Sequence, residues 1–448
     1  MNTVYATIET NPRLAPSCAT GGCSTTKASE TGMNEYQSQN KCNGRTPPLR
    51  KGGHWERIVC CASVVLIATF ANAQDAPFRF KPVTVAENLP EDPYGIDIAD
   101  FNIDRKPDIL LIRFNEIAWY RAPNWEKHVI ITNATKHNCY GAAHTIDRDG
   151  LPDVVVASDW NPGDTKDGGT ITYARQIAET ESPWPTVRID NAPTLHRVRW
   201  IDTDGDDAKE LVISPLKGPD DQGSRLALYR VPRDPSQDTW PSELIDDSLH
   251  ITHAHIGVQF DSDKAEEVLV TAYEGIFLFD RGSDGQWKKT KLGKGEQSTE
   301  PHTGSSEVAF GKLKTGQRFI GAIEPWHGHE VVVYLEPADK STPWQRFMLD
   351  DTFDQGHGVD TGDLDGDGDD ELVAGYRGPN KKHNKPTSLK AYDPVDPANG
   401  KWTTHWIDDG DMALEDVRIV DMNADGKPDI VAAGRATRNV KLYLNVTE

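Results

Sequence analysis

Short apolar runs, each preceded by an acidic turn, recur along most of the chain. Residues 109–112, 154–157 and 372–374 are examples, and the turns lie about 45 to 59 residues apart. Runs of this length, bounded by Gly, Asp and Asn, predict buried β-strands. In most units a run with alternating apolar positions follows, as at residues 117–120, and then a strand that begins at a tryptophan such as Trp125. Each unit therefore predicts four strands.

The unit occurs seven times. Four strands in each of seven units predict an all-β protein, a seven-bladed β-propeller of four-stranded antiparallel blades. The last unit ends after its third strand, so we expect residues 78–86 to supply the fourth strand of that blade and close the ring. The turns of the seven units begin at Asp100, Thr145, Asp202, Asp261, Gly311, Asp363 and Asp421.

The first 73 residues differ from the repeats in composition. Arg50, Lys51 and Arg57 precede an apolar stretch at residues 58–71, which ends in Ala-Asn-Ala at residues 71–73. This arrangement predicts a disordered leader with a signal peptide, cleaved near Ala73, although a single-span anchor remains an alternative. Residues 74–448 then form one propeller domain of a secreted or periplasmic protein, without a membrane segment after cleavage. Cys139 is its only cysteine, so no intramolecular disulfide is expected.

The formal net charge of −22 argues against a nucleic-acid partner, because a phosphate backbone would be repelled. Much of the acidity lies in the turns, where carboxylates two residues apart around glycines predict loops that wrap calcium. The turn at Asp363 has the fullest pattern, and Glu371 would complete its oxygen cage. The predicted calcium ligands are Asp363, Asp365, Asp367, Glu371, Asp202, Asp204, Asp206, Asp421, Asn423 and Asp425.

Two resemblances follow from these motifs. The Asp-x-Asp-x-Asp-Gly turns between strands resemble the FG-GAP (VCBS) repeats of integrin-type propellers. Residues 324–330, 357–371, 415–417 and 434–439 resemble the propeller module of aldos-2-ulose dehydratase-like proteins, which act on keto-sugars such as anhydrofructose. The likeness covers about residues 78–446. Enzymes of that family also carry cupin modules, and none fits in this chain.

Histidines gather on one predicted face of the propeller. In a four-stranded antiparallel blade, the acidic turns lie on one face and the starts of the innermost strands on the other. The loops between second and third strands lie on that second face as well. They contribute Trp160, Trp326, His327, His329, Arg377 and Arg435. The residues six positions before each turn, expected around the central funnel, are Tyr94, Cys139, His196, His255, Ser305, His357 and Glu415.

Several histidines near one axis predict a divalent metal site with an open position, occupied by zinc or a similar ion. We expect the ligands to be His255, His302 and His357, with His253 facing the same way as His255. A free histidine could remove the proton α to a sugar carbonyl, and a metal ion would polarise that carbonyl. The expected catalytic residues are His196, His327, His329, Glu415 and Arg435, and the expected substrate-binding residues are Trp160, Trp326, Arg377 and Tyr94.

The sequence supports three functional hypotheses. The dehydratase resemblance implies β-elimination on a small saccharide, either a keto-sugar or a 3-keto-glycoside. A non-catalytic propeller that binds carbohydrate or protein in a calcium-dependent way is the second. The third is a polysaccharide lyase on uronic acids, in which Arg377 and Arg435 would neutralise the carboxylate. The oligomeric state is left open.

Overall fold

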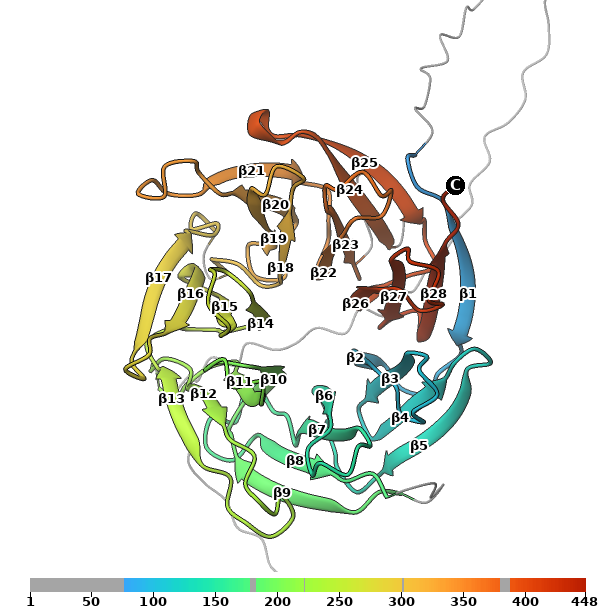
Figure 1. Cartoon of the computed structure of the whole chain (residues 1–448), viewed down its shortest axis with the longest axis vertical. Coiled ribbons are helices and arrows are strands. Elements are labelled where there is room, and N and C mark those ends of the chain that lie inside the picture. The colour runs from blue at the N-terminus through green and yellow to red at the C-terminus, as the bar shows by residue number, and fades with distance from the viewer. Residues whose placement is uncertain (1–75, 178–182, 221, 300–301, 379–386) are drawn as a thin grey trace, which may run out of the picture. The chain divides into compact units, whose positions relative to one another are not determined.

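A computed structural model of the chain describes residues 76–448, except for 178–182, 221, 300–301 and 379–386. The predicted leader, signal peptide and cleavage position near Ala73 lie outside these residues. Seven four-stranded antiparallel sheets are arranged around a central channel (Figure 1), which confirms the seven-bladed propeller. Within the described part of the chain, no helix is long and apolar enough to span a membrane.

The first four blades follow one another along the chain, each with its innermost strand first. Blade 1 comprises β2 (Pro93–Ala99), β3 (Asp108–Arg113), β4 (Glu116–Arg121) and β5 (Glu126–Thr132). Blade 2 comprises β6 (Tyr140–His144), β7 (Asp153–Ser158), β8 (Thr170–Ala174) and β9 (Thr186–Asn191). Blade 3 comprises β10 (Leu195–Ile201), β11 (Glu210–Pro215), β12 (Leu226–Tyr229) and β13 (Ser242–Asp246). Blade 4 comprises β14 (Ala254–Val258), β15 (Glu267–Ala272), β16 (Gly275–Arg281) and β17 (Trp287–Gly293).

The last three blades complete the ring. Blade 5 comprises β18 (Val308–Lys312), β19 (Arg318–Glu324), β20 (Glu330–Leu335) and β21 (Gln345–Asp350). Blade 6 comprises β22 (Gly356–Gly362), β23 (Glu371–Tyr376), β24 (Ser388–Asp396) and β25 (Lys401–Asp408), with the short 3-10 helix η1 (Pro397–Asn399) between the last two. Blade 7 comprises β26 (Leu414–Val420), β27 (Asp429–Gly434), β28 (Asn439–Asn445) and β1 (Phe80–Ala86).

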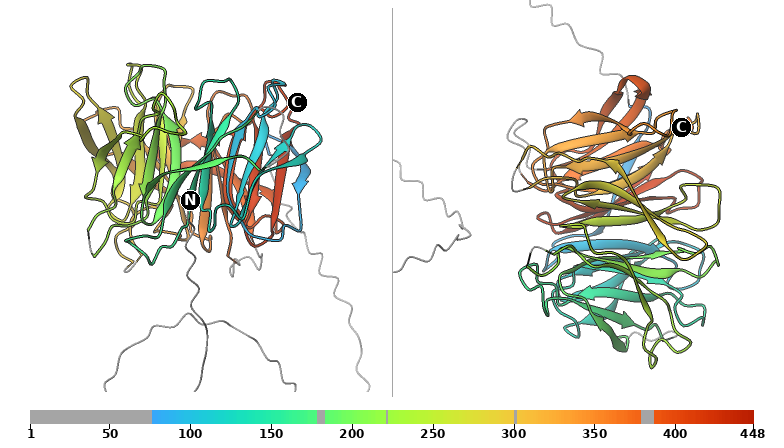
Figure 2. Two further views of the ribbon diagram at one scale, coloured as in Figure 1. Left: turned by 90° about the horizontal axis from the view of Figure 1, so that it is seen from below. Right: turned by 90° about the vertical axis from the view of Figure 1, so that its left-hand side faces the viewer.

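The N-terminal strand closes the ring, as predicted. β1 pairs antiparallel with β28, from Phe80 opposite Asn445 to Thr84 opposite Lys441. Antiparallel order puts the acidic turns on one face of the propeller, the turn face, and the starts of the innermost strands on the other, the mouth face. Figure 2 shows the blades edge-on, with loops at both of these faces.

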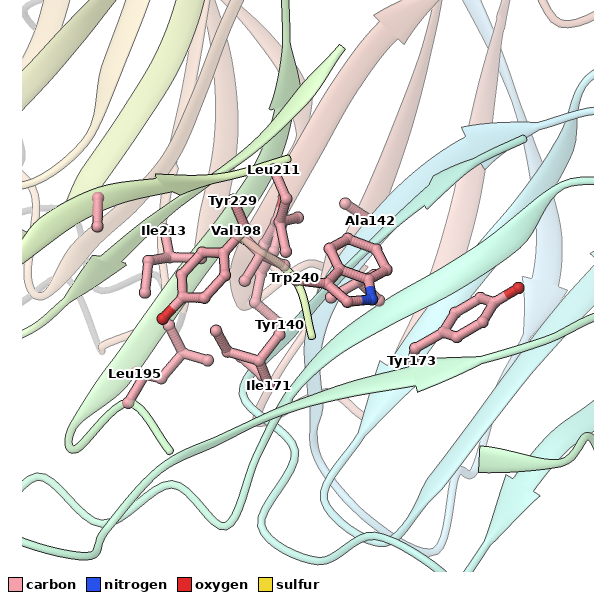
Figure 3. Packing of buried hydrophobic residues seen from close by; sticks show 14 of the residues in the cluster. Tyr140, Ala142, Ile171, Tyr173, Leu195, Val198, Leu211, Ile213, Tyr229 and Trp240 are labelled. Carbon is pink, nitrogen blue, oxygen red and sulfur yellow. The ribbon is translucent and has the colours of Figure 1, made fainter. Parts of the chain in front are cut away.

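An apolar layer fills each interface between neighbouring blades. The buried residues form seven clusters, and each cluster combines residues of two adjacent blades. Between blades 2 and 3, for example, Tyr140, Tyr173 and Ile171 pack with Leu195 and Trp240 (Figure 3). The strand faces are apolar on both sides because each blade is covered on both sides. Burial at about 25 cal/mol per Å² of apolar surface makes this the main stabilising term.

A buried carboxylate fixes the acidic turn in six of the blades. It belongs to the first residue of the second strand and accepts a hydrogen bond from the backbone N–H seven residues earlier, which is the second turn residue in five blades and Phe260, just before the shortened turn, in blade 4. In blade 1 the N–H of Phe101 donates to Asp108 (3.0 Å), whose other oxygen accepts from the N–H of Ala122 (2.8 Å). Blade 5 instead has Arg318, paired with Glu336. The six carboxylates are those of Asp108, Asp153, Glu210, Glu267, Glu371 and Asp429.

We predict that Asp108→Ala lowers the free energy of unfolding by about 1 to 3 kcal/mol, because two buried N–H groups lose their acceptor. Asp104→Ala, in the same turn but exposed, serves as the control and should change it by less than about 0.5 kcal/mol. Urea unfolding followed by tryptophan fluorescence measures both. Equal effects of the two substitutions would contradict the assigned role of Asp108.

Candidate functional site

Irregularities in the innermost strands turn side chains into the channel at the mouth face. The pairing of β2 with β3 skips Tyr94, that of β10 with β11 skips His196, and that of β26 with β27 skips Glu415. β22 has a similar shift at Gly358, next to His357. A β-bulge leaves one residue unpaired and redirects its side chain. In three blades the skipped residue lines the mouth cavity, and in blade 6 the shift directly follows His357, which also lines it.

These side chains line a cavity of about 190 Å³ at the mouth face. The cavity brings together most of the residues that the sequence analysis singled out, and its lining residues come from all seven blades. They are Tyr94, Trp160, His196, Trp326, His327, His357, Arg377, Glu415 and Arg435, joined by His253 and Cys139.

Three histidines come close enough to share one cation. The ligand atoms of His253, His327 and His357 all lie within 4.8 Å of one another. The Nε2 atoms of His253 and His327 are 2.7 Å apart. His196 adjoins the group, with its ring centroid 4.5 Å from that of His253.

The tautomers of three of these histidines follow from their partners. Nδ1 of His196 donates to the carbonyl of His253 (2.9 Å), and Nδ1 of His253 lies 3.1 Å from the carbonyl of Ser306. Nδ1 of His357 donates to the carbonyl of Glu415 (2.5 Å). Each acceptor lies in the next blade, and a backbone carbonyl can only accept. The proton is therefore on Nδ1, and Nε2 keeps the lone pair that a metal ion or a substrate proton requires.

The four histidines are held neutral. Burial lowers the pKa of His196, His253, His327 and His357 well below the usual value, and nearby positive groups such as Arg197 and Arg377 add to this effect. Neutral imidazoles are the form that binds divalent metals. This donor set thus fits zinc or a similar ion, with His253, His327 and His357 as nitrogen ligands.

Three predicted histidines are not in this group. His255 uses both ring nitrogens inside the fold, with Nδ1 2.8 Å from the hydroxyl of Ser214 and Nε2 3.2 Å from the carbonyl of Val212. His302 is exposed and lies beside Trp326, outside the cavity lining. His329 is half exposed, at 50%, and lies near Glu330. The expected ligand set of His255, His302 and His357 is therefore not brought together, and only His357 belongs to the observed group.

The register of β14 explains this difference. Counting six residues back from each turn assumes that all innermost strands have the same number of residues. β14 pairs with β15 without a bulge, with His255 directly opposite Val270. In this blade the residue that reaches the mouth is His253, two positions earlier.

One buried acid escaped the sequence analysis. Glu307 precedes β18 in the blade whose turn has lost the acidic pattern, so no motif marked it. Its Oε1 lies 3.0 Å from Nδ1 of His253 and 3.4 Å from Nε2 of His357, and Arg197 donates to it from 3.2 Å. Burial raises the pKa of Glu307 to about 7.

The predicted arginines are already paired. Glu415 accepts from Nη1 of Arg377 (2.5 Å) and from Nη1 of Arg435 (3.4 Å). Arg435 also donates to the hydroxyl oxygen of Tyr94 (2.9 Å). Nη2 of Arg377 donates to Nδ1 of His327 (3.2 Å), so the proton of the His327 ring is on Nε2. This proton lies between His327 and His253, and a bound cation would replace it. Asp92 lies 3.7 Å from Nε of Arg435, so Glu415 and Asp92 together already pair with the two arginines.

The two loop tryptophans differ in what they offer. Trp326 is stacked on His327, with centroids 4.4 Å apart, and the tilted ring of His302 lies 5.1 Å away. The stacked contact shows that Trp326 supports His327. Trp160 lies between Tyr94 and His196 at centroid distances of 6.5 and 5.8 Å, without a stacked partner among the described residues. Trp160 is therefore the better platform for a sugar ring.

The acidic turns lie on the turn face, away from this cavity. Carboxylate oxygens of Asp363, Asp365 and Glu371 lie within 4.8 Å of one another, as do those of Asp202, Asp204 and Asp206. Asp261, Asp263 and Glu267 form a third group. Asp367 instead accepts from Lys314 (2.9 Å). In the last turn Asn423 donates to Asp425 (3.1 Å), and the N–H of Gly426 donates to Asp421 (2.8 Å).

The fold and the site together define a seven-bladed propeller with a histidine-rich cavity at one mouth of its channel. Residues 168–337, which include His196, His253 and His327, match the family model "Aldos-2-ulose dehydratase, beta-propeller domain". The chain is 25% identical over 290 residues to aldos-2-ulose dehydratase from Phanerodontia chrysosporium. That alignment covers 58% of this chain and 31% of the relative, so the chain spans less than a third of that protein.

Solved structures show the same fold. An ancestral GH74 enzyme has a TM-score of 0.53 to this chain at 11% sequence identity, with 80% of this chain and 48% of that chain covered. At this identity the similarity concerns the propeller architecture alone.

We predict that His327→Ala weakens zinc binding by more than the roughly 10–100-fold typical of a change outside the ligand shell. The reason is that one of three nitrogen ligands is lost. His302→Ala should bind zinc as the wild type does, because His302 is not in the cluster. Isothermal titration calorimetry measures both affinities. A greater loss in His302→Ala than in His327→Ala would favour the ligand set expected from the sequence.

Proposed function

We propose that the protein is a secreted or periplasmic carbon–oxygen lyase of the dehydratase type. It acts on a keto-sugar or a 3-keto-glycoside bound in the mouth cavity. The observation that carries the proposal is the convergence of buried, neutral histidines whose Nε2 atoms face one cavity. The partial similarity to the propeller domain of an aldos-2-ulose dehydratase gives independent support.

The residues divide into a cation site and an elimination site. His253, His327 and His357 would hold a divalent ion, which when bound would polarise the sugar carbonyl as a Lewis acid. His196 is not needed as a ligand, and its Nε2 is free apart from the weak contact of 3.5 Å with Arg197. We assign His196 as the base that removes the proton from the carbon next to the carbonyl.

The leaving group needs a proton as well. The oxygen of Tyr94 accepts from Arg435, so its own O–H is available for the oxygen that departs. As the C–H electrons form the C=C bond, the C–O bond breaks, and water or an alcohol leaves with the proton of Tyr94. Trp160, which lies between His196 and Tyr94, would carry the sugar ring in between. Arg377 and Arg435, fixed by Glu415, would orient its hydroxyl groups.

The uronic-acid hypothesis receives less support from this arrangement. A lyase acting on uronic acids has to neutralise the substrate carboxylate, and Glu415 and Asp92 already pair with the two candidate arginines. No comparable observation favours a purely binding propeller, because a binding role gives no reason to bury four neutral histidines at one mouth.

We predict that His196→Gln lowers the elimination rate about 10²- to 10⁴-fold, since general-base catalysis is lost. Absorbance of the enone product from anhydrofructose or a 3-keto-glycoside follows the reaction. The matched control is His302→Ala, which should keep the wild-type rate. Absence of elimination by the zinc-loaded wild type on every keto-sugar and uronide tested would reject the lyase and leave a binding propeller.

We also propose that the Asp363 turn binds calcium as a structural ion. Asp363, Asp365 and Glu371 supply hard oxygen ligands, as calcium prefers. Oε1 of Glu371 is buried and has no hydrogen-bond partner among the described residues, which is the state of a ligand atom facing a cation. Secretion would place the turn in a calcium-rich medium. The Asp202 and Asp421 turns are weaker candidates.

Calcium at about 10 mM should stabilise the protein by roughly 1.4 to 2.7 kcal/mol if the affinity is in the range of extracellular modules, about 10⁻⁴–10⁻³ M. Asp365→Asn should abolish this gain. Asp367→Asn, whose carboxylate is paired with Lys314, is the matched control and should retain it. Thermal melts with calcium and with EDTA measure the effect, and a gain that persists in Asp365→Asn would exclude this turn as the site.

A further inference from the structure

Glu307 lies against two of the three clustered histidines. Its side chain is 11% exposed, and its Oε1 is 3.0 Å from Nδ1 of His253 and 3.4 Å from Nε2 of His357. Nη2 of Arg197 donates to the same oxygen from 3.2 Å. The carboxylate of Glu307, in blade 5, thus contacts side chains from blades 3, 4 and 6.

Glu307 lies on the turn-face side of the histidines and does not line the mouth cavity, where a substrate would bind. A second cavity, of about 500 Å³, occupies the channel on the turn-face side, and Glu307 lines it together with Arg199, Asp360 and Arg418. Glu307 is not among the residues that line the mouth cavity, whereas Arg197 lines both cavities. The pair of Arg197 and Glu307 therefore separates the two cavities. A side chain placed there meets a substrate only through the histidines.

The contacts of Glu307 have two physical consequences for a cation above it. A carboxylate that accepts from the Nδ1–H of a ligating imidazole, as Glu307 can from His253, fixes the orientation of the ring and increases the basicity of its free nitrogen. Glu307 also compensates the guanidinium of Arg197, whose Nη1 is 3.5 Å from Nε2 of His196. Without that compensation, a buried positive charge would oppose the binding of a second one.

We propose that Glu307 is a positioning residue of the metal site, which orients His253 and offsets the charge of Arg197 so that a divalent cation binds tightly. This inference rests on the proposed cation site of the proposed function. It concerns affinity for the ion and does not require a particular reaction.

Glu307→Gln tests this role, because the amide keeps the shape of the side chain and removes its charge. Zinc binding to the full chain, measured by isothermal titration calorimetry, should weaken roughly 10–100-fold. The visible absorption spectrum of the cobalt-loaded protein should also change, because the ligand rings reorient. Glu210→Gln is the control: Glu210 is similarly buried but lies at the turn face, and this variant should keep the wild-type affinity and spectrum.

Two results would overturn the inference. One is an affinity and a cobalt spectrum of Glu307→Gln equal to those of the wild type. The other is the same loss in Glu210→Gln, which would indicate general destabilisation. A wild type that binds neither zinc nor cobalt would remove the cation site and this inference together. A wild type that binds zinc but eliminates water from no keto-sugar would reject only the proposed reaction, since binding is measured without turnover.

Discussion

The hydrogen bond from the acidic turn to a buried carboxylate is the constraint on which the arrangement of six of the seven blades depends. It ties the end of the innermost strand to the start of the second strand, as Phe101 is tied to Asp108 and Leu364 to Glu371. Both ends of the turn are then fixed at the turn face. Any difference in length between innermost strands has to appear at the other end, at the mouth face. The bulges at Tyr94, His196 and Glu415 are located there.

This division explains what the sequence could and could not predict. The seven blades and the closing strand follow from a repeat with fixed spacing between turn and strand, which the apolar pattern records directly. Which histidines cluster at the mouth depends on the presence or absence of bulges, and a bulge leaves no mark on that pattern. His253 and His255 are two residues apart, so the alternation of side chains along a strand does not distinguish them. Only the regular pairing of β14 determines that His253 is the one at the mouth. Glu307 was missed because the count in its blade, made from the degenerate turn at Gly311, gives Ser305, two residues earlier.

The charges of the channel are arranged in buried pairs. Arg377 and Arg435 share Glu415, and Arg197 binds Glu307. An unpaired buried charge would cost several kcal/mol, by order of magnitude, so the pairs are needed for the fold to tolerate them. The same pairs leave the histidines as the neutral groups of the cavity. Nitrogen ligands at the mouth face and carboxylate ligands at the turn face suit two different classes of cation, softer ions and calcium respectively.

Each ring nitrogen that fixes a tautomer reaches into the following blade. His196 in blade 3 depends on blade 4, and His357 in blade 6 depends on the carbonyl of Glu415 in blade 7. Blade 7 in turn is completed only by β1, from the other end of the domain. No single blade or pair of blades therefore contains the site. Loosening of the pairing between β1 and β28 would reach His357 through β26, so the geometry of the candidate site is a property of the closed ring.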